Sequence, residues 1–219
     1  MILASSIPAP SRDCPLCPRL VAFRGEAKSI LPGAWNSPVP SWGPENAPLL
    51  IVGLAPGLRG ANRTGRPFTG DYAGDTLYAA LKRHGFAIGT YDKRPDDGLE
   101  LIDCRITNAV RCVPPENKPV GEEINTCRQF LVSEIDTLPR LQIILALGTI
   151  AHQSVLRTLK IPVARHAFGH GAVHQVRPNL ILADSYHCSR YNVNTNRLTE
   201  AMFDAVIANL RALLTQAGH

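Results

Sequence analysis

Short apolar runs alternate along the chain with segments that repeat apolar residues every three or four positions. The runs cover residues 49–54, 106–110, 143–147 and 180–183 and are rich in Ile, Val and Leu. Such runs are typical of strands buried on both faces of a parallel sheet, and the intervening periodicity is typical of amphipathic helices. The helices are expected at 75–84, 122–138, 150–159 and 198–214. This alternation predicts a three-layer α/β/α sandwich around a four-stranded, mostly parallel sheet, with ligand sites in the loops after the strands.

Length and composition favour one domain that acts on a polyanion. The 219 residues are 45% apolar and 19% charged, and 23 Lys and Arg against 18 Asp and Glu give a net charge of +5. We expect a single domain over 1–219, with residues 1–29 as an appendage. No apolar run approaches the ~18 residues of a membrane span, and the N-terminus does not resemble a signal peptide, so we expect a cytoplasmic protein. The basic excess makes nucleic acid the first partner to consider.

The cysteines favour a metal or cluster site over disulfides, because nothing at the N-terminus points to an oxidising compartment. Cys14 and Cys17 form a Cys-x-x-Cys pair, and Cys112 and Cys127 complete a set of four. Their separations of 3, 95 and 15 residues do not match a compact zinc ribbon. Four thiolates hold either zinc or an iron–sulfur cluster. The remaining two are expected to be unligated, buried side chains: Cys104 and Cys188.

The loop after the first predicted strand, residues 53–71, is rich in glycine and arginine. Such a loop suits close approach to phosphates and to a flat ligand, although it lacks the Lys-Ser/Thr of a nucleotide-binding loop. Its arginines, Arg59, Arg63 and Arg66, are expected to contact phosphates, as is Arg190 in the loop after the fourth strand. Phe68 is either a plug that closes the core or a platform on which a base stacks.

Two further polar residues end or follow predicted strands. Asn108 lies at the end of the second strand, where its amide could pair with a base. His187 follows the fourth strand, where it could donate a hydrogen bond or act as a general acid. An isolated Asn or His is more often structural, so the position after a strand is what favours a functional role.

Several segments together resemble a known family. They are Cys-Pro-Leu-Cys-Pro-Arg-Leu at 14–20, Gly-Leu-Ala-Pro-Gly at 53–57, Asn-Arg-Thr-Gly-Arg-Pro-Phe-Thr-Gly-Asp at 62–71, Thr-Asn-Ala-Val-Arg-Cys-Val-Pro-Pro-Glu-Asn-Lys-Pro at 107–119, and 187–199. In order and spacing the chain resembles the uracil-DNA glycosylase superfamily, most closely its type b, or family five, iron–sulfur branch. The resemblance spans about residues 14–205.

The resemblance implies a role for each candidate residue. Phe68 would stack on a flipped base, Asn108 would read its edge, and His187 would donate to the uracil O2 as negative charge develops. Asp71 would position water or stabilise the sugar cation. The other implied groups are a base pocket on Gly53, Ala55, Pro56 and Gly57, DNA contacts from Ser189 with the arginines, and a [4Fe–4S] cluster on Cys14, Cys17, Cys112 and Cys127.

These expectations describe a monomeric, monofunctional glycosylase that hydrolyses the N-glycosidic bond of deoxyuridine in DNA, near the nucleoid. Other deaminated bases are further candidate substrates. Two other classes of protein remain open. A non-catalytic nucleic-acid-binding protein with a four-cysteine structural metal would release no base, and an iron–sulfur electron carrier would need a reversible potential. Neither requires the set of Phe68, Asn108 and His187.

Overall fold

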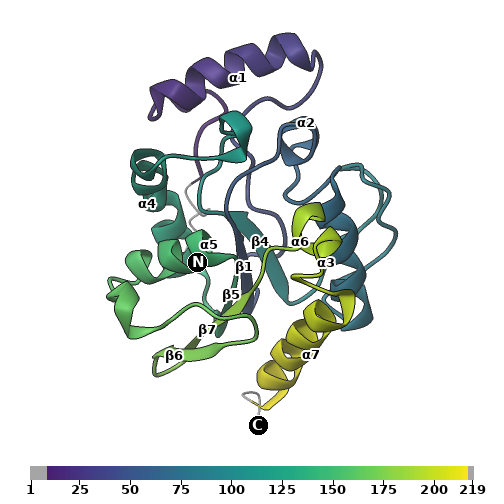
Figure 1. Ribbon diagram of the computed structural model, residues 1–219, viewed down its shortest axis with the longest axis vertical. Helices are drawn as coiled ribbons and strands as arrows, with labels where there is room; N and C mark the ends of the chain where they lie inside the picture. Colours follow the sequence, from purple (N-terminus) through teal and green to yellow (C-terminus); the bar gives the residue numbers. More distant parts are fainter. Residues whose placement is uncertain (1–8, 217–219) are drawn as a thin grey trace, which may run out of the picture.

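A computed structural model of the chain, which describes residues 9–216, is built around one five-stranded sheet (Figure 1). The strand order is β4-β1-β5-β7-β6; the first four strands are parallel, and β6 pairs antiparallel with β7. Every residue of β1, β4 and β5 is buried, which explains the uninterrupted apolar runs of β1 and β5. Strand β4 also buries polar side chains, and it lies two residues earlier than the predicted run at 106–110. The strands are β1 Leu49–Gly53, β4 Cys104–Asn108, β5 Ile143–Leu147, β6 Val173–Arg177 and β7 Leu180–Ser185, with a separate ribbon of β2 Ala87–Ile88 and β3 Glu100–Leu101.

Helices cover both faces of the sheet, as Figure 1 shows. Alternate residues of the strands point to opposite faces, so that Leu49 and Ile51 join one core and Leu50 and Val52 join the other. The first core is closed by α3 Tyr72–Arg83 and α7 Glu200–Gln216, and the second by α4 Gly121–Thr137 and α5 Thr149–Thr158. The shorter helices lie in connections: α2 Ala61–Thr64, η1 Pro115–Asn117, η2 Val163–Arg165 and α6 Arg190–Asn194.

The N-terminal segment forms a helix, α1 Pro18–Ile30, outside the sandwich. Leu20 of α1 packs with Val110 and Ile124 and with two cysteines in a third, small core. Arg19 pairs with Glu123 of α4 at 2.7 Å. The expected appendage thus contacts the sandwich through α4 and the segment after β4, while the first eight residues of its predicted range lie outside the described residues.

The predicted α/β/α sandwich and its four parallel strands are confirmed, with two differences. The sheet has a fifth strand, β6, and α1 is a helix that the periodicity did not reveal. The exposed fraction of β6 alternates along the strand, because this edge strand has one face toward solvent and lacks a long apolar run. No helix in the described part of the chain is long and apolar enough to cross a membrane.

Candidate active site

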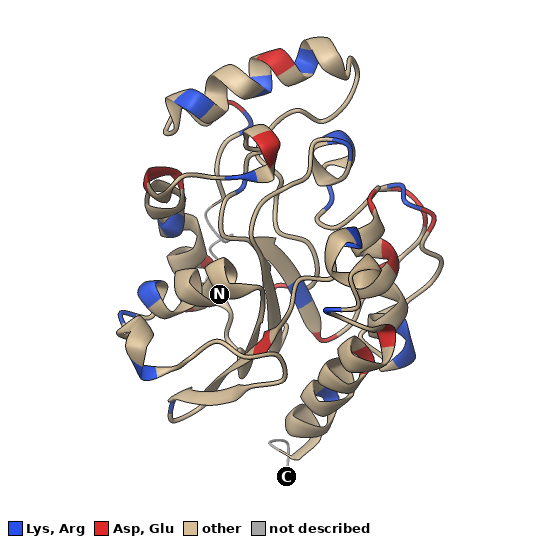
Figure 2. Cartoon of the chain, in the orientation of Figure 1, with Lys and Arg blue, Asp and Glu red and all other residues tan. Residues whose placement is uncertain are grey.

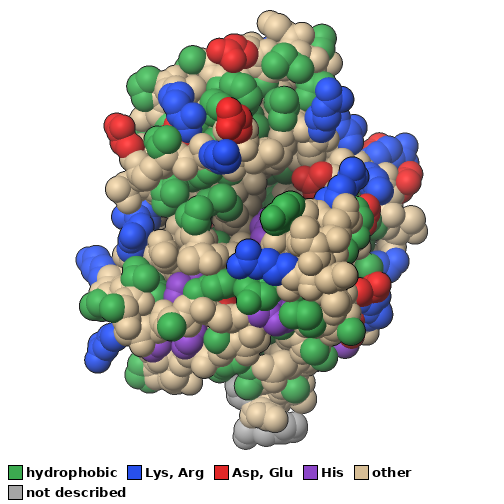
Figure 3. Space-filling view, viewed as in Figure 1, with side chains coloured by type: hydrophobic (Ala, Val, Ile, Leu, Met, Phe, Trp, Pro, Cys, Tyr) green, Lys and Arg blue, Asp and Glu red, His purple; other side chains and the backbone are tan. Residues whose placement is uncertain are grey.

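A pocket of about 600 Å³ opens where β1, β4 and β7 end. Figure 3 shows a hollow on this face of the molecule, and residues of α2, η1 and α6 are among those that line the pocket. Carboxyl ends of parallel strands are the usual place for ligand sites in such sheets. Sixteen residues line the pocket: Leu54, Ala55, Pro56, Gly57, Arg59, Ala61, Phe68, Gly70, Asp71, Tyr72, Ala73, Asn108, Asn117, His187, Ser189 and Arg190.

Phe68 is both buried and part of the pocket wall. Its backbone is left-handed, with φ of 51°, and its carbonyl accepts a hydrogen bond from Tyr91. A Cβ on Gly74 would lie 1.9 Å from that carbonyl oxygen, so only glycine fits beneath the turn. The Phe68 ring stacks on His187 with 5.9 Å between centroids. The two alternatives raised by the sequence are therefore compatible, since the ring closes the core and presents an aromatic surface to the pocket.

Asn108 ends β4 beside Gly53, the last residue of β1. Its side chain is 4% exposed and lines the pocket. A Cβ on Gly53 would lie 2.4 Å from Asn108 Oδ1 and 2.7 Å from Phe68 Cζ. The missing side chain of Gly53 thus lets the amide and the ring come together, which is the role of this glycine in the pocket. Gly53 itself is not among the residues that line the pocket; it lies behind the Asn108 amide and the Phe68 ring.

His187 follows β7 and lies half-buried in the pocket wall. Burial lowers the pKa of its imidazole to about 4, so the ring is neutral at pH 7 and carries one N–H donor. Its carbonyl accepts a hydrogen bond from the Asn192 side chain at 2.8 Å. Ser189 caps α6 by accepting a hydrogen bond from the Asn192 amide. The loop that carries His187 is therefore held by the helix that follows it.

Asp71 begins α3 as its N-cap, with Oδ1 accepting a hydrogen bond from the Gly74 amide at 3.4 Å. Its other oxygen faces the loop after β1, where a Cβ on Gly60 would lie 2.2 Å from Oδ2 and one on Gly57 would lie 3.3 Å away. Burial is the largest influence on this carboxyl group and raises its pKa. A carboxylate in this environment can hold a water molecule or face a developing positive charge.

The arginines predicted to bind DNA fall into two environments. Arg59 and Arg190 are exposed at the pocket, whereas Arg63 is exposed in a neighbouring groove beside Trp35. Arg66 is 4% exposed and makes two 2.8 Å hydrogen bonds to the carboxylate of Asp97.

The predicted phosphate contact from Arg66 is therefore wrong, because the guanidinium is already paired inside the protein. It also lies over the ring of Trp42, 4.7 Å from the centroid. An arginine that bridges a carboxylate and an aromatic ring in the interior fixes the loop rather than reaching a ligand.

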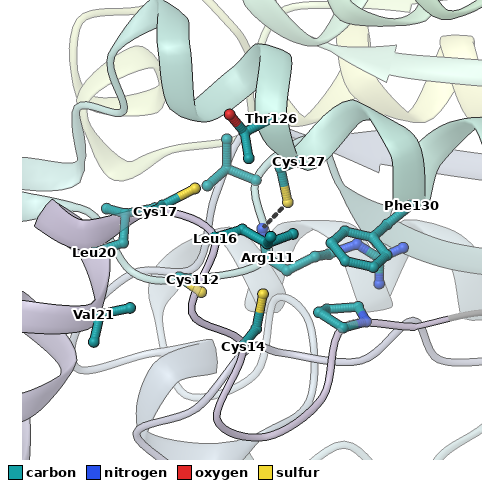
Figure 4. A pocket seen from close by; sticks show the side chains of 12 residues that line it. Cys14, Leu16, Cys17, Leu20, Val21, Arg111, Cys112, Thr126, Cys127 and Phe130 are labelled. Carbon is teal, nitrogen blue, oxygen red and sulfur yellow. Dashed lines mark hydrogen bonds between the residues drawn. The ribbon is translucent and has the colours of Figure 1, made fainter.

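The four cysteines predicted as ligands lie together at a second site, although they come from three separate segments of the sequence. Figure 4 shows the thiols of Cys14, Cys17, Cys112 and Cys127 facing one space, between the start of α1, the segment after β4, and α4. The wall is apolar, with Leu16, Leu20, Val21, Val110 and Phe130 among its residues.

The cysteine site also contains two N–H contacts to sulfur that the sequence did not reveal, one from a guanidinium and one from a backbone amide. Arg24 Nη1 lies 3.5 Å from Cys112 Sγ, and the Arg111 amide donates to Cys127 Sγ at 3.4 Å. Burial raises the pKa of the Cys112 thiol to about 12 and that of Cys127 to about 11. Ionised sulfurs here therefore require a compensating cation.

Cys104 and Cys188 lie elsewhere, as expected. Both are fully buried in the core beside α3, where their thiols donate to the carbonyls of Phe86 and Ala73. They behave as small buried side chains.

Pocket residues that sequence reasoning did not identify are Leu54, Ala61, Gly70, Tyr72, Ala73 and Asn117. Tyr72 directly follows Asp71, and Arg190 lies over its ring at 5.6 Å from the centroid. Asn117 reaches the pocket from η1 through a left-handed turn, with φ of 58°. The sequence feature that could have identified Asn117 is its position in the 107–119 segment, which carries part of the family resemblance.

Comparison with known proteins gives one family over most of the chain. The model of the Uracil DNA glycosylase superfamily matches residues 40–211. The chain is 42% identical over 205 residues to the type-5 uracil-DNA glycosylase of Thermus thermophilus, covering 91% of this chain and 93% of that protein. It is 43% identical to the type-5 enzyme of Mycobacterium leprae over 96% of each chain, and 42% identical to that of Pyrobaculum aerophilum over 85% and 83%. The chain belongs to the uracil-DNA glycosylase superfamily and, within it, groups with the type-5 proteins.

Proposed function

We propose that this protein is a monofunctional DNA glycosylase that hydrolyses the N-glycosidic bond of deoxyuridine in DNA and leaves an abasic site. The observation that carries the proposal is the convergence of Phe68, Asn108, His187 and Asp71 on one pocket at the strand ends. The relatives named as type-5 uracil-DNA glycosylases support the same reaction. We expect the protein to act as a monomer.

Base recognition begins with extrusion of the nucleotide from the duplex, because the bond cannot be reached inside the stack. Extrusion costs a few kcal/mol and is cheapest for a mismatched pair such as U·G. The flipped base would stack on Phe68 and present its edge to Asn108, whose amide offers both a donor and acceptors. Another deaminated base with a similar edge is a second candidate substrate.

Bond cleavage produces a uracil anion and an oxocarbenium-like sugar. The N–H of neutral His187 would stabilise the charge that develops on the uracil O2. The carboxylate of Asp71 would position water or face the sugar cation.

 The His187 N–H and the Asp71 carboxylate both act on charge that exists mainly in the transition state, which is where stabilisation accelerates a reaction. The Phe68 ring stacks on His187 with 5.9 Å between centroids, and this contact would hold the imidazole beside the flipped base. The stack itself contributes no charge.

DNA binding would rest on basic side chains around the pocket. Figure 2 shows basic residues on α2 and α6, which flank the opening, and Arg59 and Arg190 are exposed there. Such residues neutralise phosphates and would hold the protein on nucleoid DNA while the base is extruded.

The cysteine site fits a [4Fe–4S] cluster held by Cys14, Cys17, Cys112 and Cys127. Four thiols from three separate segments face one apolar space, and clusters of this kind are held by cysteine thiolates. Among the described residues, one group of three or more ligating side chains has all its ligand atoms within 4.8 Å of one another, and that group is outside the cysteine site. The four cysteine sulfurs are therefore more widely spaced than this. Sulfurs around one tetrahedral zinc at ~2.3 Å would lie closer together than that, so the wider spacing favours a cluster.

When bound, the cluster would supply a structural link among α1, α4 and the segment after β4 rather than a step in hydrolysis. Leu20 of α1 packs in the same small core as Cys112 and Cys127, so loss of this link should loosen the N-terminal helix.

The test is incubation of pure protein with an end-labelled U·G duplex, followed by alkali and electrophoresis. We expect scission at the uracil, only after alkali, and none in a matched C·G duplex. Absence of scission with folded, DNA-binding protein would favour the non-catalytic alternative. Duplexes that contain hypoxanthine or xanthine measure how broad the base preference is.

A further inference from the structure

A second group of ligating side chains lies outside the pocket and the cysteine site. It consists of His152 on α5, His174 on β6 and Asp184 on β7. The ligand atoms of the three lie within 4.8 Å of one another. His152 and Asp184 are 1% and 0% exposed, and the His174 side chain is 16% exposed. None of the three lines the pocket at the strand ends.

The hydrogen bonds orient the imidazole of His152. Its Nε2 lies 2.9 Å from the carbonyl oxygen of His166, which can only accept, so Nε2 carries a hydrogen. The other nitrogen, Nδ1, faces Asp184 Oδ1 at 2.8 Å. His174 Nε2 faces the second carboxylate oxygen at 3.3 Å. Two imidazole nitrogens therefore converge on one buried carboxylate.

This arrangement is the usual one for a metal-binding histidine. Such a residue donates its outer N–H to a carbonyl or carboxylate, and this contact fixes the ring so that the other nitrogen faces the metal. The His166 carbonyl supplies that contact to His152. Asp184 is fully buried, so its carboxylate needs a compensating positive charge, which either a bound ion or a protonated imidazole would supply.

We propose that His152 Nδ1, His174 Nε2 and Asp184 bind a divalent transition-metal ion of the zinc class. Two imidazoles and one carboxylate suit zinc and its neighbours, whereas calcium and magnesium take all-oxygen sites. Three protein ligands leave a fourth tetrahedral position for water or for His166, whose ring centroid is 5.1 Å from that of His174.

The ion would join α5 to the β6–β7 edge of the sheet and stabilise the start of the loop that carries His187. Asp184 pairs with Ala146 of β5 in the parallel sheet, and its amide donates to the Ala172 carbonyl at 3.0 Å. His187 lies three residues further on. The role is structural, and it does not depend on which base the pocket accepts.

Zinc binding to the protein with its cysteine site loaded tests the proposal. Untagged protein is treated with EDTA, its visible absorption is checked, and zinc is titrated in competition with a chromophoric chelator while Tm is followed. We expect one equivalent of zinc and a raised Tm. His174→Gln, at the partly exposed ligand, should weaken zinc binding by at least about tenfold, since even outer contacts to metal ligands are worth that much.

His84→Gln is the matched control, because His84 lies at the end of α3 and pairs with Asp204. It should bind zinc as the wild type does. Wild-type protein with no saturable zinc, or His174→Gln with wild-type affinity, would overturn the proposal and leave the group as a charge-paired His–Asp cluster. Because the readout is zinc affinity, this outcome is separate from the presence or absence of glycosylase activity.

Discussion

Replacing Gly53 by alanine tests whether the pocket depends on close packing between its amide and its ring. The new Cβ would lie 2.4 Å from Asn108 Oδ1, 2.7 Å from Phe68 Cζ and 3.0 Å from Phe68 Cε2. Ordinary carbon contacts begin near ~3.5 Å, so the amide must move by about 1 Å and the ring by somewhat less. Neither moves freely, because Asn108 ends β4, a strand whose residues are all buried, and the Phe68 carbonyl lies against Gly74.

The expected result is a large loss of rate with a small loss of stability. Misplacement of a positioning group by about 1 Å can cost about 100-fold in rate, whereas overpacking a core costs about 1–3 kcal/mol. We therefore expect the Gly53→Ala single-turnover rate on a U·G duplex to fall about 100-fold. The Tm should fall by about 2–12 °C for a chain of this size.

Gly25→Ala is the control, since a Cβ on this α1 residue meets nothing within 4 Å. It should keep the wild-type rate and raise stability slightly, by up to about 1 kcal/mol. A folded Gly53→Ala protein with the wild-type rate would refute the reasoning, because the pocket would then tolerate displacement of its amide and ring.

Three further predictions concern the same account. His187→Ala should lower the single-turnover rate by about 10²–10³ while affinity for a uracil-containing duplex, measured by gel shift, is retained; a wild-type rate would remove the donor role. Replacing Arg59 and Arg190 together by Gln should reduce the slope of log Kd against log salt by about 2, and an unchanged slope would remove their phosphate contacts. Because burial lowers the folded pKa of His187 to about 4, the unfolded chain binds its proton first as pH falls. Urea unfolding should therefore show wild-type stability falling relative to His187→Gln between about pH 6.5 and pH 4, and a constant difference would contradict the neutral, buried ring.

The sheet could be predicted from the sequence because strands buried on both faces carry a direct signal. Every position of β1 and β5 is buried, so each reads as an apolar run. Strand β4 is also buried but contains Arg105, Thr107 and Asn108, so its predicted range of 106–110 is displaced by two residues. Strand β6 has no such signal, because its residues alternate between exposed and half-buried positions. Helix α1 was also hidden, since it packs on the small core around the cysteines and not on the sheet.

Site residues could be located where a strand end fixes them, as for Asn108 at the end of β4 and His187 just after β7. Arg66 shows the limit of that reasoning. Its burial depends on Asp97, 31 residues away, and loop composition carries no information about such a pairing. Asn117 likewise reaches the pocket only through its left-handed backbone.

The central claim is that a uracil base is cleaved while it lies between Phe68, Asn108 and His187. The most direct measurement is a crystal structure with a duplex whose deoxyuridine carries a 2′-fluorine, which slows cleavage by destabilising the oxocarbenium-like sugar. We predict a flipped uracil stacked on Phe68, with its edge on Asn108 and its O2 within hydrogen-bond distance of His187. A uracil that stays paired in the helix, or that is bound outside this pocket, would contradict the account.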